Sequence, residues 1–235
     1  MKPSKKILFD GRFLSLSHAG LGRYTLELFK GLLKNNPKQK YILLVLRGVK
    51  FDRELAKAVN EHKEPVEIVE TEIGHYSVSE QIKLPRLLSK LKPSLVHFPH
   101  FNHPLLYRGP FVVTIHDLTL SQYTERGNFL KKIAYNLIIA HAAKKARKIL
   151  TVSDFVKKEI AREYKINLQK IQTTYNGIDT KFEKITNPKY VDKLLEVFGL
   201  VMLPVNWAQI EPERGHYDFS TIDQHRAALR KPKYL

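Results

Sequence analysis

The sequence predicts a doubly wound α/β domain with a mostly parallel, Rossmann-like sheet, and two observations carry that prediction. Short runs rich in β-branched and aromatic residues alternate along the chain with longer segments whose apolar residues recur at helical spacing. Such alternation is typical of helices that cover both faces of a parallel sheet. In addition, several strands stop at polar residues, as "FVVTIH" stops at His116 beside Asp117.

The expected strands are short and apolar, and they occupy residues 5–10, 41–47, 65–71, 94–99, 111–116, 148–153 and 170–179. The helices between them are expected at residues 23–34, 51–62, 78–91, 128–146 and 154–164. Pro85 is expected to bend or divide the third helix, and Ser153 suits the N-cap of the last one.

The fourth helix carries apolar Leu130, Ile133 and Leu137 along one side, surrounded by basic residues (Lys131, Lys132, Lys144, Lys145, Arg147 and Lys148). This pattern fits an interfacial helix attracted to anionic lipid. It also fits a core-packed helix with a solvated basic face, which is the favoured interpretation.

Composition excludes several classes of protein. The 235 residues contain no cysteine, so disulfides, thiolate catalysis and Cys-ligated zinc are excluded and a reducing, cytoplasmic compartment is expected. The apolar stretches are shorter than the ~18 residues of a membrane span, so a soluble protein is expected. The formal net charge of +17 suits nucleic acid, an anionic membrane surface or a phosphate-bearing small molecule, although a lysine-rich proteome would also produce it. Nucleic acid is not an expected partner, because the chain has no RNP-type or zinc motif.

Polar residues at the strand ends define the expected site. In a doubly wound sheet, ligands bind beyond the carboxyl ends of the strands, near the point where the strand order reverses. His116 and Asp117 could simply terminate a strand, but the convergence of five strand ends favours a ligand-binding role. The residues expected on this rim are Asp10, Gly11, Arg12, His97, Phe98, Pro99, His100, His116, Asp117, Ser153, Asn176 and Gly177.

The motif "GLGRY" is expected in the loop between the first strand and the first helix. There, Gly20 and Gly22 would let backbone N–H groups approach an anion, and Arg23 could pair with a phosphate. The alternative is an ordinary loop that needs glycine for its backbone conformation.

The stretch "HFPHFNHP" spaces His97, His100 and His103 at intervals of three. Its prolines exclude a regular helix, and no acidic residue completes a metal-ligand set. No metal site is therefore expected, and a loop that lines a sugar or nucleotide pocket is favoured.

Residues 5–200 resemble the N-terminal half of a retaining glycosyltransferase with the two-domain GT-B fold, from the large family that includes bacterial mannosyl- and glucosyltransferases. The matching segments are "GLGRYTLEL", "LVHFPHFNHPL", "VVTIHDLTLSQYTE", "ILTVSDFVKKEI" and "KIQTTYNGID", in the order and approximate spacing of the family. The resemblance implies sugar transfer from a nucleotide-sugar to a saccharide or lipid-linked acceptor, without cofactor or metal ion. It also implies a possible peripheral location on the inner face of a membrane.

The resemblance further implies roles for single residues. His116 would be catalytic, in contact with the transferred sugar or the acceptor. The donor phosphates would be faced by Gly20, Gly22 and Arg23. The acceptor would be bound by His97, His100, Asn102 and Asp117, with Ser153 and Asn176 elsewhere in the cleft.

The chain departs from the family after residue 200. The second Rossmann-like domain, which would hold the nucleotide-sugar, has no counterpart, and "RKPKYL" (residues 230–235) looks like its beginning. Residues 201–223 instead resemble a strand-loop-helix unit of barrel-type β-galactosidases without the catalytic carboxylates. Glu211 and Glu213 are expected to be solvated loop residues. This segment could be an insertion, an artefact or a deliberate chimera.

The expected organisation is an acceptor-side Rossmann-like domain (residues 1–200), an atypical strand-loop-helix segment (201–229) and the start of a missing domain (230–235). The atypical segment is expected to bury Trp207, Tyr217 and Phe219 against the main domain. The expected function is that of the acceptor-binding half of a glycosyltransferase, inactive alone. A non-catalytic basic binding module and an engineered fragment are the alternatives.

Overall fold

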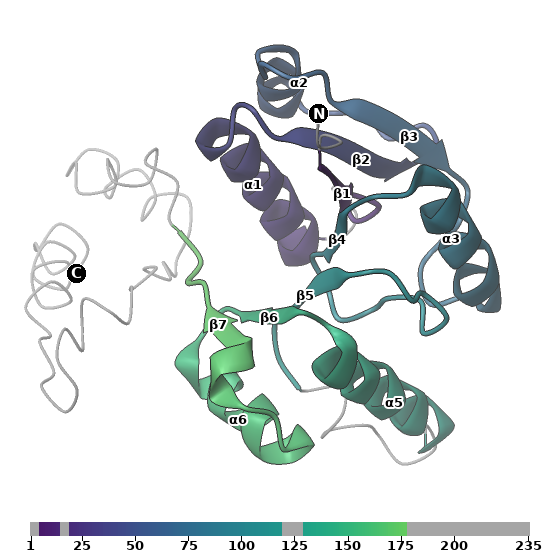
Figure 1. Cartoon of the computed structure of the whole chain (residues 1–235), viewed down its shortest axis with the longest axis vertical. Helices are drawn as coiled ribbons and strands as arrows, with labels where there is room; N and C mark the ends of the chain where they lie inside the picture. The colour runs from purple at the N-terminus through teal and green to yellow at the C-terminus, as the bar shows by residue number, and fades with distance from the viewer. Residues whose placement is uncertain (1–4, 15–18, 119–128, 178–235) are drawn as a thin grey trace, which may run out of the picture. The chain divides into compact units, whose positions relative to one another are not determined.

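A computed structural model of the chain describes residues 5–14, 19–118 and 129–177 (Figure 1). The chain divides into two units after Asn176, and the description below concerns the first. The predictions for residues 178–235 lie outside the described residues, including the domain boundary at residue 200 and the segment that resembles a glycosidase barrel.

A parallel sheet forms the centre of this unit, and the described part of the chain supplies seven strands in the order β3-β2-β1-β4-β5-β6-β7. Every neighbouring pair is parallel. The order reverses between β1 and β4, which confirms the predicted doubly wound, Rossmann-like class. The strands are β1 (Lys6–Asp10), β2 (Lys40–Leu46), β3 (Glu67–Thr71), β4 (Leu95–Phe98), β5 (Phe111–Ile115), β6 (Lys148–Thr151) and β7 (Ile171–Thr173).

Helices cover both faces of the sheet. Successive side chains of a strand point to opposite faces, so neighbouring residues of one strand belong to different core clusters. Phe9 belongs to a core cluster with Phe29 of α1 and Leu55 of α2. Its neighbour Leu8 belongs to a second cluster, which includes residues of α3, α5 and α6. The helices are α1 (Ala19–Asn35), α2 (Arg53–Asn60), α3 (Val78–Leu91), α5 (Phe129–Lys145) and α6 (Asp154–Tyr164), and η2 (Leu168–Lys170) is a short 3-10 turn.

One helix differs from the prediction. The expected loop around Gly20 and Gly22 is wrong, because α1 already begins at Ala19 and contains both glycines. Of the two outcomes expected at Pro85, division of the helix is excluded, because Pro85 is buried within a continuous α3. Ser77 caps α3 and Ser153 caps α6, each by accepting a hydrogen bond from the backbone three residues later.

The buried side of α5 is not the side that the sequence suggested. Ile139, Ala142 and Ala143 are buried, since their spacing faces the sheet and small side chains allow close packing. Ile133 and Leu137, expected on the core side, are 40% and 59% exposed. No helix among the described residues is long and apolar enough to cross a bilayer.

Candidate functional site

The candidate site lies where the strand order reverses, at the carboxyl ends of β1, β4 and β5. Phe9 of β1 is paired in register with His97 of β4, and His97 with Val112 of β5. The loops that follow these strands therefore begin side by side, although they lie far apart in the sequence.

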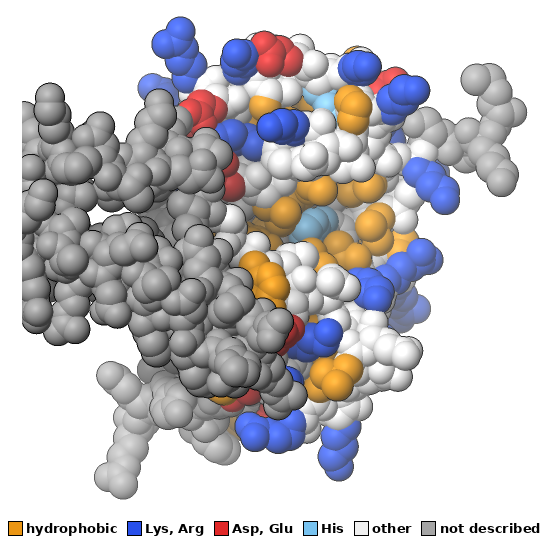
Figure 2. Space-filling view, turned by 90° about the vertical axis from the view of Figure 1, so that its left-hand side faces the viewer, with side chains coloured by type: hydrophobic (Ala, Val, Ile, Leu, Met, Phe, Trp, Pro, Cys, Tyr) orange, Lys and Arg blue, Asp and Glu red, His pale blue; other side chains and the backbone are white. Residues whose placement is uncertain are grey.

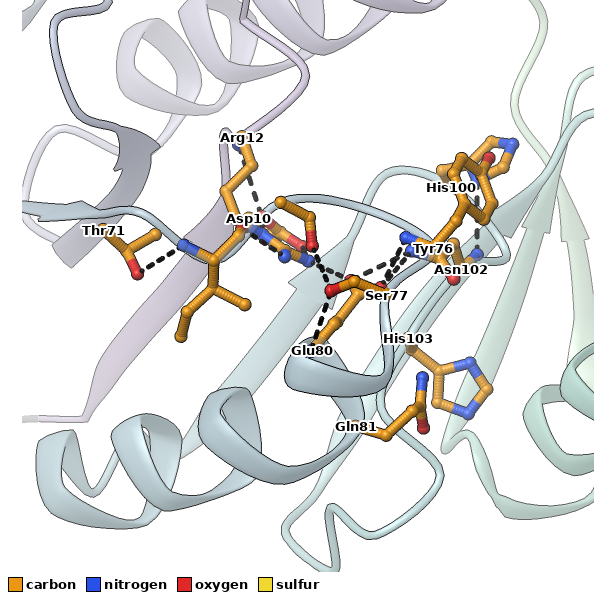
Figure 3. Close-up of polar contacts among 12 residues, drawn as sticks. Asp10, Arg12, Thr71, Tyr76, Ser77, Glu80, Gln81, His100, Asn102 and His103 are labelled. Carbon is orange, nitrogen blue, oxygen red and sulfur yellow. Dashed lines mark hydrogen bonds and ion pairs between the residues drawn. The ribbon is translucent and has the colours of Figure 1, made fainter.

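A buried charged network ties the end of β1 to the start of α3 and to the loop after β4 (Figure 3). Arg12 donates to both carboxylate oxygens of Asp10, from Nε at 2.8 Å and from Nη2 at 2.7 Å. Arg12 Nη2 also donates to Glu80 Oε1 of α3 at 2.8 Å, and Nη1 donates to the carbonyl of Ile73 at 3.1 Å. All three charged side chains are essentially inaccessible to water. We refer to Asp10, Arg12, Glu80 and Asn102 as the clasp.

Asn102 joins the clasp from the loop after β4. Its Nδ2 donates to both carboxylate oxygens of Glu80, at 2.9 and 3.0 Å. The backbone N–H of Tyr76 completes the shell of Glu80 by donating to Oε2 at 2.8 Å. The clasp therefore fixes the end of β1, the start of α3 and the loop after β4 relative to one another.

Electrostatics within the clasp favour the charged forms. Burial alone would raise the pKa of Asp10, but the charge and hydrogen bonds of Arg12 outweigh it and hold that pKa below its ordinary value. Burial likewise opposes the charge of Arg12, and the two carboxylates more than offset it, so the pKa of Arg12 is raised. A paired ionic core of this kind positions the loops more than it stabilises them.

Aromatic and imidazole rings from four loops and from α1 meet beside the clasp. Phe13 stacks on His75 with ring centroids 3.6 Å apart, and His100 lies 5.3 Å from Phe13. His116 lies 6.2 Å from His100 and meets the edge of Tyr24 at 4.5 Å. These five residues form what we call the imidazole rim.

The histidines of the imidazole rim are held neutral at physiological pH. Burial, with the charges of His116 and His75, lowers the pKa of His100 to about 3. Burial also lowers the pKa of His75 and of His116. His116 Nε2 donates to the carbonyl of Pro99 at 2.9 Å, so Nδ1 of the neutral ring is the hydrogen-bond acceptor.

His97, expected on the rim, instead lies within β4 and is only 6% exposed. Its ring meets the edge of Phe9 at 5.2 Å, and its Nε2 lies 3.4 Å from Thr114 Oγ1. Burial lowers its pKa to about 4. Thr114 Oγ1 is also 3.1 Å from the hydroxyl of Tyr24, so His97 supports the imidazole rim from beneath.

The other residues predicted for the site lie outside the imidazole rim. Asn102 belongs to the clasp, and His103 is fully buried, with its Nδ1 donating to the carbonyl of Phe101 at 2.9 Å. Asp117 is exposed beside His116, and Asn176 is exposed after β7. The Ser153 hydroxyl is engaged as the α6 cap.

In α1, Gly22 is buried, Gly20 is exposed and Arg23 pairs with Glu27 at 3.0 Å on the helix surface. No cluster of His, Asp or Glu in the described ranges has the arrangement of a metal site. On the face shown in Figure 2, hydrophobic side chains gather around a histidine, whereas Lys and Arg side chains lie around them, towards the top, the right-hand edge and the bottom of the view.

Sequence reasoning missed Glu80 of the clasp, and Phe13, Tyr24 and His75 of the imidazole rim. Ser77 and Glu80 have the S-x-x-E spacing of a capping box, a pattern that by itself predicts a solvated helix start. Ser77 does accept from the backbone of Glu80 at 3.0 Å, but the Glu80 carboxylate turns inward to Arg12. Tyr24 stands in the sequence only as the last residue of the GLGRY motif, with no local signal that its ring meets His116.

Comparisons with known proteins identify the family of the chain. A model of the family described as Glycosyltransferase Family 4 matches residues 18–182. The O-antigen chain mannosyltransferase RfbU of Salmonella typhimurium is 29% identical over 104 residues, covering 44% of this chain and 28% of that protein. The chain thus spans less than a third of this curated relative.

Two solved structures are similar at low identity. A glycosyltransferase from Rickettsia africae is 20% identical, with a TM-score of 0.49, over 85% of this chain and 51% of its own. The UDP-GlcNAc 2-epimerase of Methanocaldococcus jannaschii is 14% identical, with a TM-score of 0.43, over 85% and 53%. Because the family match covers well over half of the 235 residues, the chain belongs to Glycosyltransferase Family 4.

Proposed function

We propose that this domain is the acceptor-binding half of a retaining, metal-independent glycosyltransferase. The transferred sugar would come from a nucleotide-sugar and go to a saccharide or lipid-linked acceptor. The observation that supports the proposal is the imidazole rim, which lies at the reversal of strand order in a chain of this family.

His116 is the central residue of the proposal. Its ring is partly accessible, and its orientation is set by the hydrogen bond to Pro99 and by the edge of Tyr24. A neutral imidazole with Nδ1 as acceptor can take a hydrogen bond from a sugar hydroxyl near the reacting centre. His100 and Asp117 are proposed to contact the acceptor from the two sides of His116, and Asn102 to hold the loop that carries His100.

The donor side is proposed at the first turn of α1. The N–H groups of that turn have no partner within the helix and favour an anion such as a pyrophosphate. Gly20, with open space where a side chain would lie, permits close approach of a ligand to the backbone. Gly22 and Arg23 complete this proposed contact, with Ser153 and Asn176 further along the same edge.

The second half of the proposal is that the chain alone does not transfer sugar. Residues 1–200 are proposed as the acceptor-side domain, and an enzyme of this type needs a donor-binding partner domain for turnover. A peripheral position on the inner face of a membrane is part of the same proposal, because the net charge of +17 would favour anionic lipid.

Saturation-transfer NMR with a panel of methyl glycosides tests the acceptor role on the 235-residue chain. We expect binding of at least one glycoside, weakened 10-fold or more by His116→Gln. His62→Gln is the matched control, because the His62 ring contacts Tyr41 and the backbone of Gln39, away from the rim. Binding that survives His116→Gln would contradict the acceptor role, and robust sugar transfer by this chain would contradict the proposed need for a donor half.

A further inference from the structure

An apolar groove lies between the start of α3 and the exposed side of α5, with a volume of about 410 Å³. We call it the α3–α5 groove. Its larger apolar lining residues are Tyr76, Val78, Leu105, Tyr135, Leu137 and Ile138. A groove of this size and character is typical of a small-molecule site.

Two of the three polar residues that line the groove, Ser77 and Gln81, are already engaged in hydrogen bonds. The Ser77 hydroxyl accepts from the backbone of Glu80, and Gln81 Oε1 accepts from the backbone of Leu105 at 2.8 Å. No charged side chain lines the groove among the described residues. Its occupant must therefore be held by contact with apolar surface rather than by ionic recognition.

The mouth of the groove is open to solvent although it is hydrophobic. Val78 is 79% exposed, Leu137 59% and Tyr76 52%. Leu137 is a residue that the sequence places on the core side of its helix. Contiguous exposed apolar side chains of this kind mark a binding surface more often than scattered single residues do.

The groove continues into the imidazole rim through Tyr76. The Tyr76 hydroxyl lies 3.4 Å from His100 Nδ1, while the same side chain forms the wall of the groove. Asn102 lies at this junction, where its Oδ1 is buried and has no hydrogen-bond partner. A molecule that fills both places is apolar at one end and carries hydrogen-bond donors, such as hydroxyls, at the other.

We infer that the α3–α5 groove binds the hydrocarbon chain of a lipid-linked acceptor, with the saccharide of that acceptor at the imidazole rim. This inference rests on the proposed function and narrows it, because a free saccharide would leave the groove empty. The groove takes one chain of a single amphiphile rather than the surface of a bilayer.

Methyl NMR on the full chain tests the inference with maltose and its hexyl and octyl glycosides, used below their micelle concentrations. Each methylene that enters an apolar site contributes ~0.8 kcal/mol, which is roughly a 4-fold gain in affinity. We expect octyl maltoside to bind roughly 15-fold more tightly than hexyl maltoside. The methyl signals of Val78, Leu105, Leu137 and Ile138 are expected to shift.

Leu137→Asp is expected to weaken octyl maltoside binding 10-fold or more without unfolding the chain, because Leu137 is exposed. Phe155→Asp is the control, since Phe155 is 70% exposed at the start of α6 and does not line the groove. The inference would be overturned if octyl and hexyl maltoside bound with equal affinity. It would also be overturned if Leu137→Asp and Phe155→Asp weakened octyl maltoside binding equally. Binding to anionic vesicles with no binding of the monomeric amphiphile would also overturn it.

The headgroup separates this inference from the proposed function. An octyl sulfobetaine has the same chain without a saccharide. If it binds in the groove as tightly as octyl maltoside, the hydrocarbon site is supported and the saccharide site at the imidazole rim is contradicted. If maltose binds but chain length adds nothing, the saccharide site is supported and the groove inference is overturned.

Discussion

Replacing Arg12 by methionine tests the clasp most directly. Methionine has a similar length but no charge and no hydrogen-bond donor. The substitution leaves two carboxylates, Asp10 and Glu80, buried without the cation that both contact. It also leaves the carbonyl of Ile73 without its Arg12 donor.

The expected loss of folding stability can be estimated from the burial of the ion pairs. Removing one partner of a buried ion pair costs about 3–5 kcal/mol, because an uncompensated charge remains in the interior. Arg12 serves two carboxylates, so we expect the upper part of that range. In a domain of this size, each kcal/mol lowers the melting temperature by roughly 2–4 °C.

The matched control is Arg23→Met on the surface of α1. Arg23 pairs with Glu27 at 3.0 Å, but the two side chains are 54% and 41% exposed. Solvent-exposed pairs at this spacing contribute about 0.3–0.5 kcal/mol, so we expect the control to lose no more than that.

Urea unfolding followed by far-UV circular dichroism at pH 7 measures both variants. If Arg12→Met is too unstable to purify, Glu80→Gln replaces it, since the bidentate contact between Arg12 and Asp10 then remains. The reasoning is refuted if Arg12→Met falls within about 1 kcal/mol of the control, or if Glu80→Gln costs nothing.

Three further predictions concern stability. Gly11→Ala should destabilise the chain by about 1–3 kcal/mol, because a Cβ there would lie 2.7 Å from a Leu43 methyl and 3.0 Å from the Leu44 carbonyl. Gly31→Ala, which has open space in α1, should stabilise it by about 0.5–1 kcal/mol. Urea midpoints equal to that of the parent chain in both variants would contradict these two expectations. The pKa of His97 is about 4 in the folded chain and 6.5 in the unfolded chain, so protons bind more tightly to the unfolded chain. The contribution of neutral His97 to the free energy of unfolding is therefore complete above pH 6.5 and falls as the pH drops, by about 2 kcal/mol at pH 5. His97→Gln should therefore lose less stability than the parent chain between pH 7 and 5, and an unchanged pH dependence would rule this out. Ser153→Ala should cost ~1 kcal/mol by removing the α6 cap, whereas Ser89→Ala, at an exposed position of α3, should not destabilise the chain, as measured by thermal unfolding.

The fold was predictable because its signals are local. Each strand is a short apolar run and each helix has its own periodicity, so alternation alone specified the parallel sheet. The N-cap at Ser153 was predictable for the same reason, since a serine followed by an acidic residue is a local signal of a helix start.

The site was predictable only where one strand end sufficed to indicate it. His116 and His100 lie at the strand ends where ligands of such folds bind, so their neighbourhood could be inferred. Glu80 could not, because its partner Arg12 is 68 residues away and its own surroundings have the pattern of a capping box. The face of α5 was misjudged because Leu137 and Ile139 are both apolar, and only the packed sheet decides which of them is buried.

The clasp also has a kinetic consequence. Arg12 and Glu80 are 68 residues apart, and Asn102 lies a further 22 residues beyond Glu80, so their contacts need the β1–β4 pairing first. Because contacts between residues far apart in the sequence carry a loop-closure cost, we expect the contacts of the clasp to form late, after the folding nucleus. We therefore expect substitutions in the clasp to speed unfolding and leave the folding rate nearly unchanged. The same contacts would then govern how long the native domain survives proteolysis when cleavage outpaces reclosing.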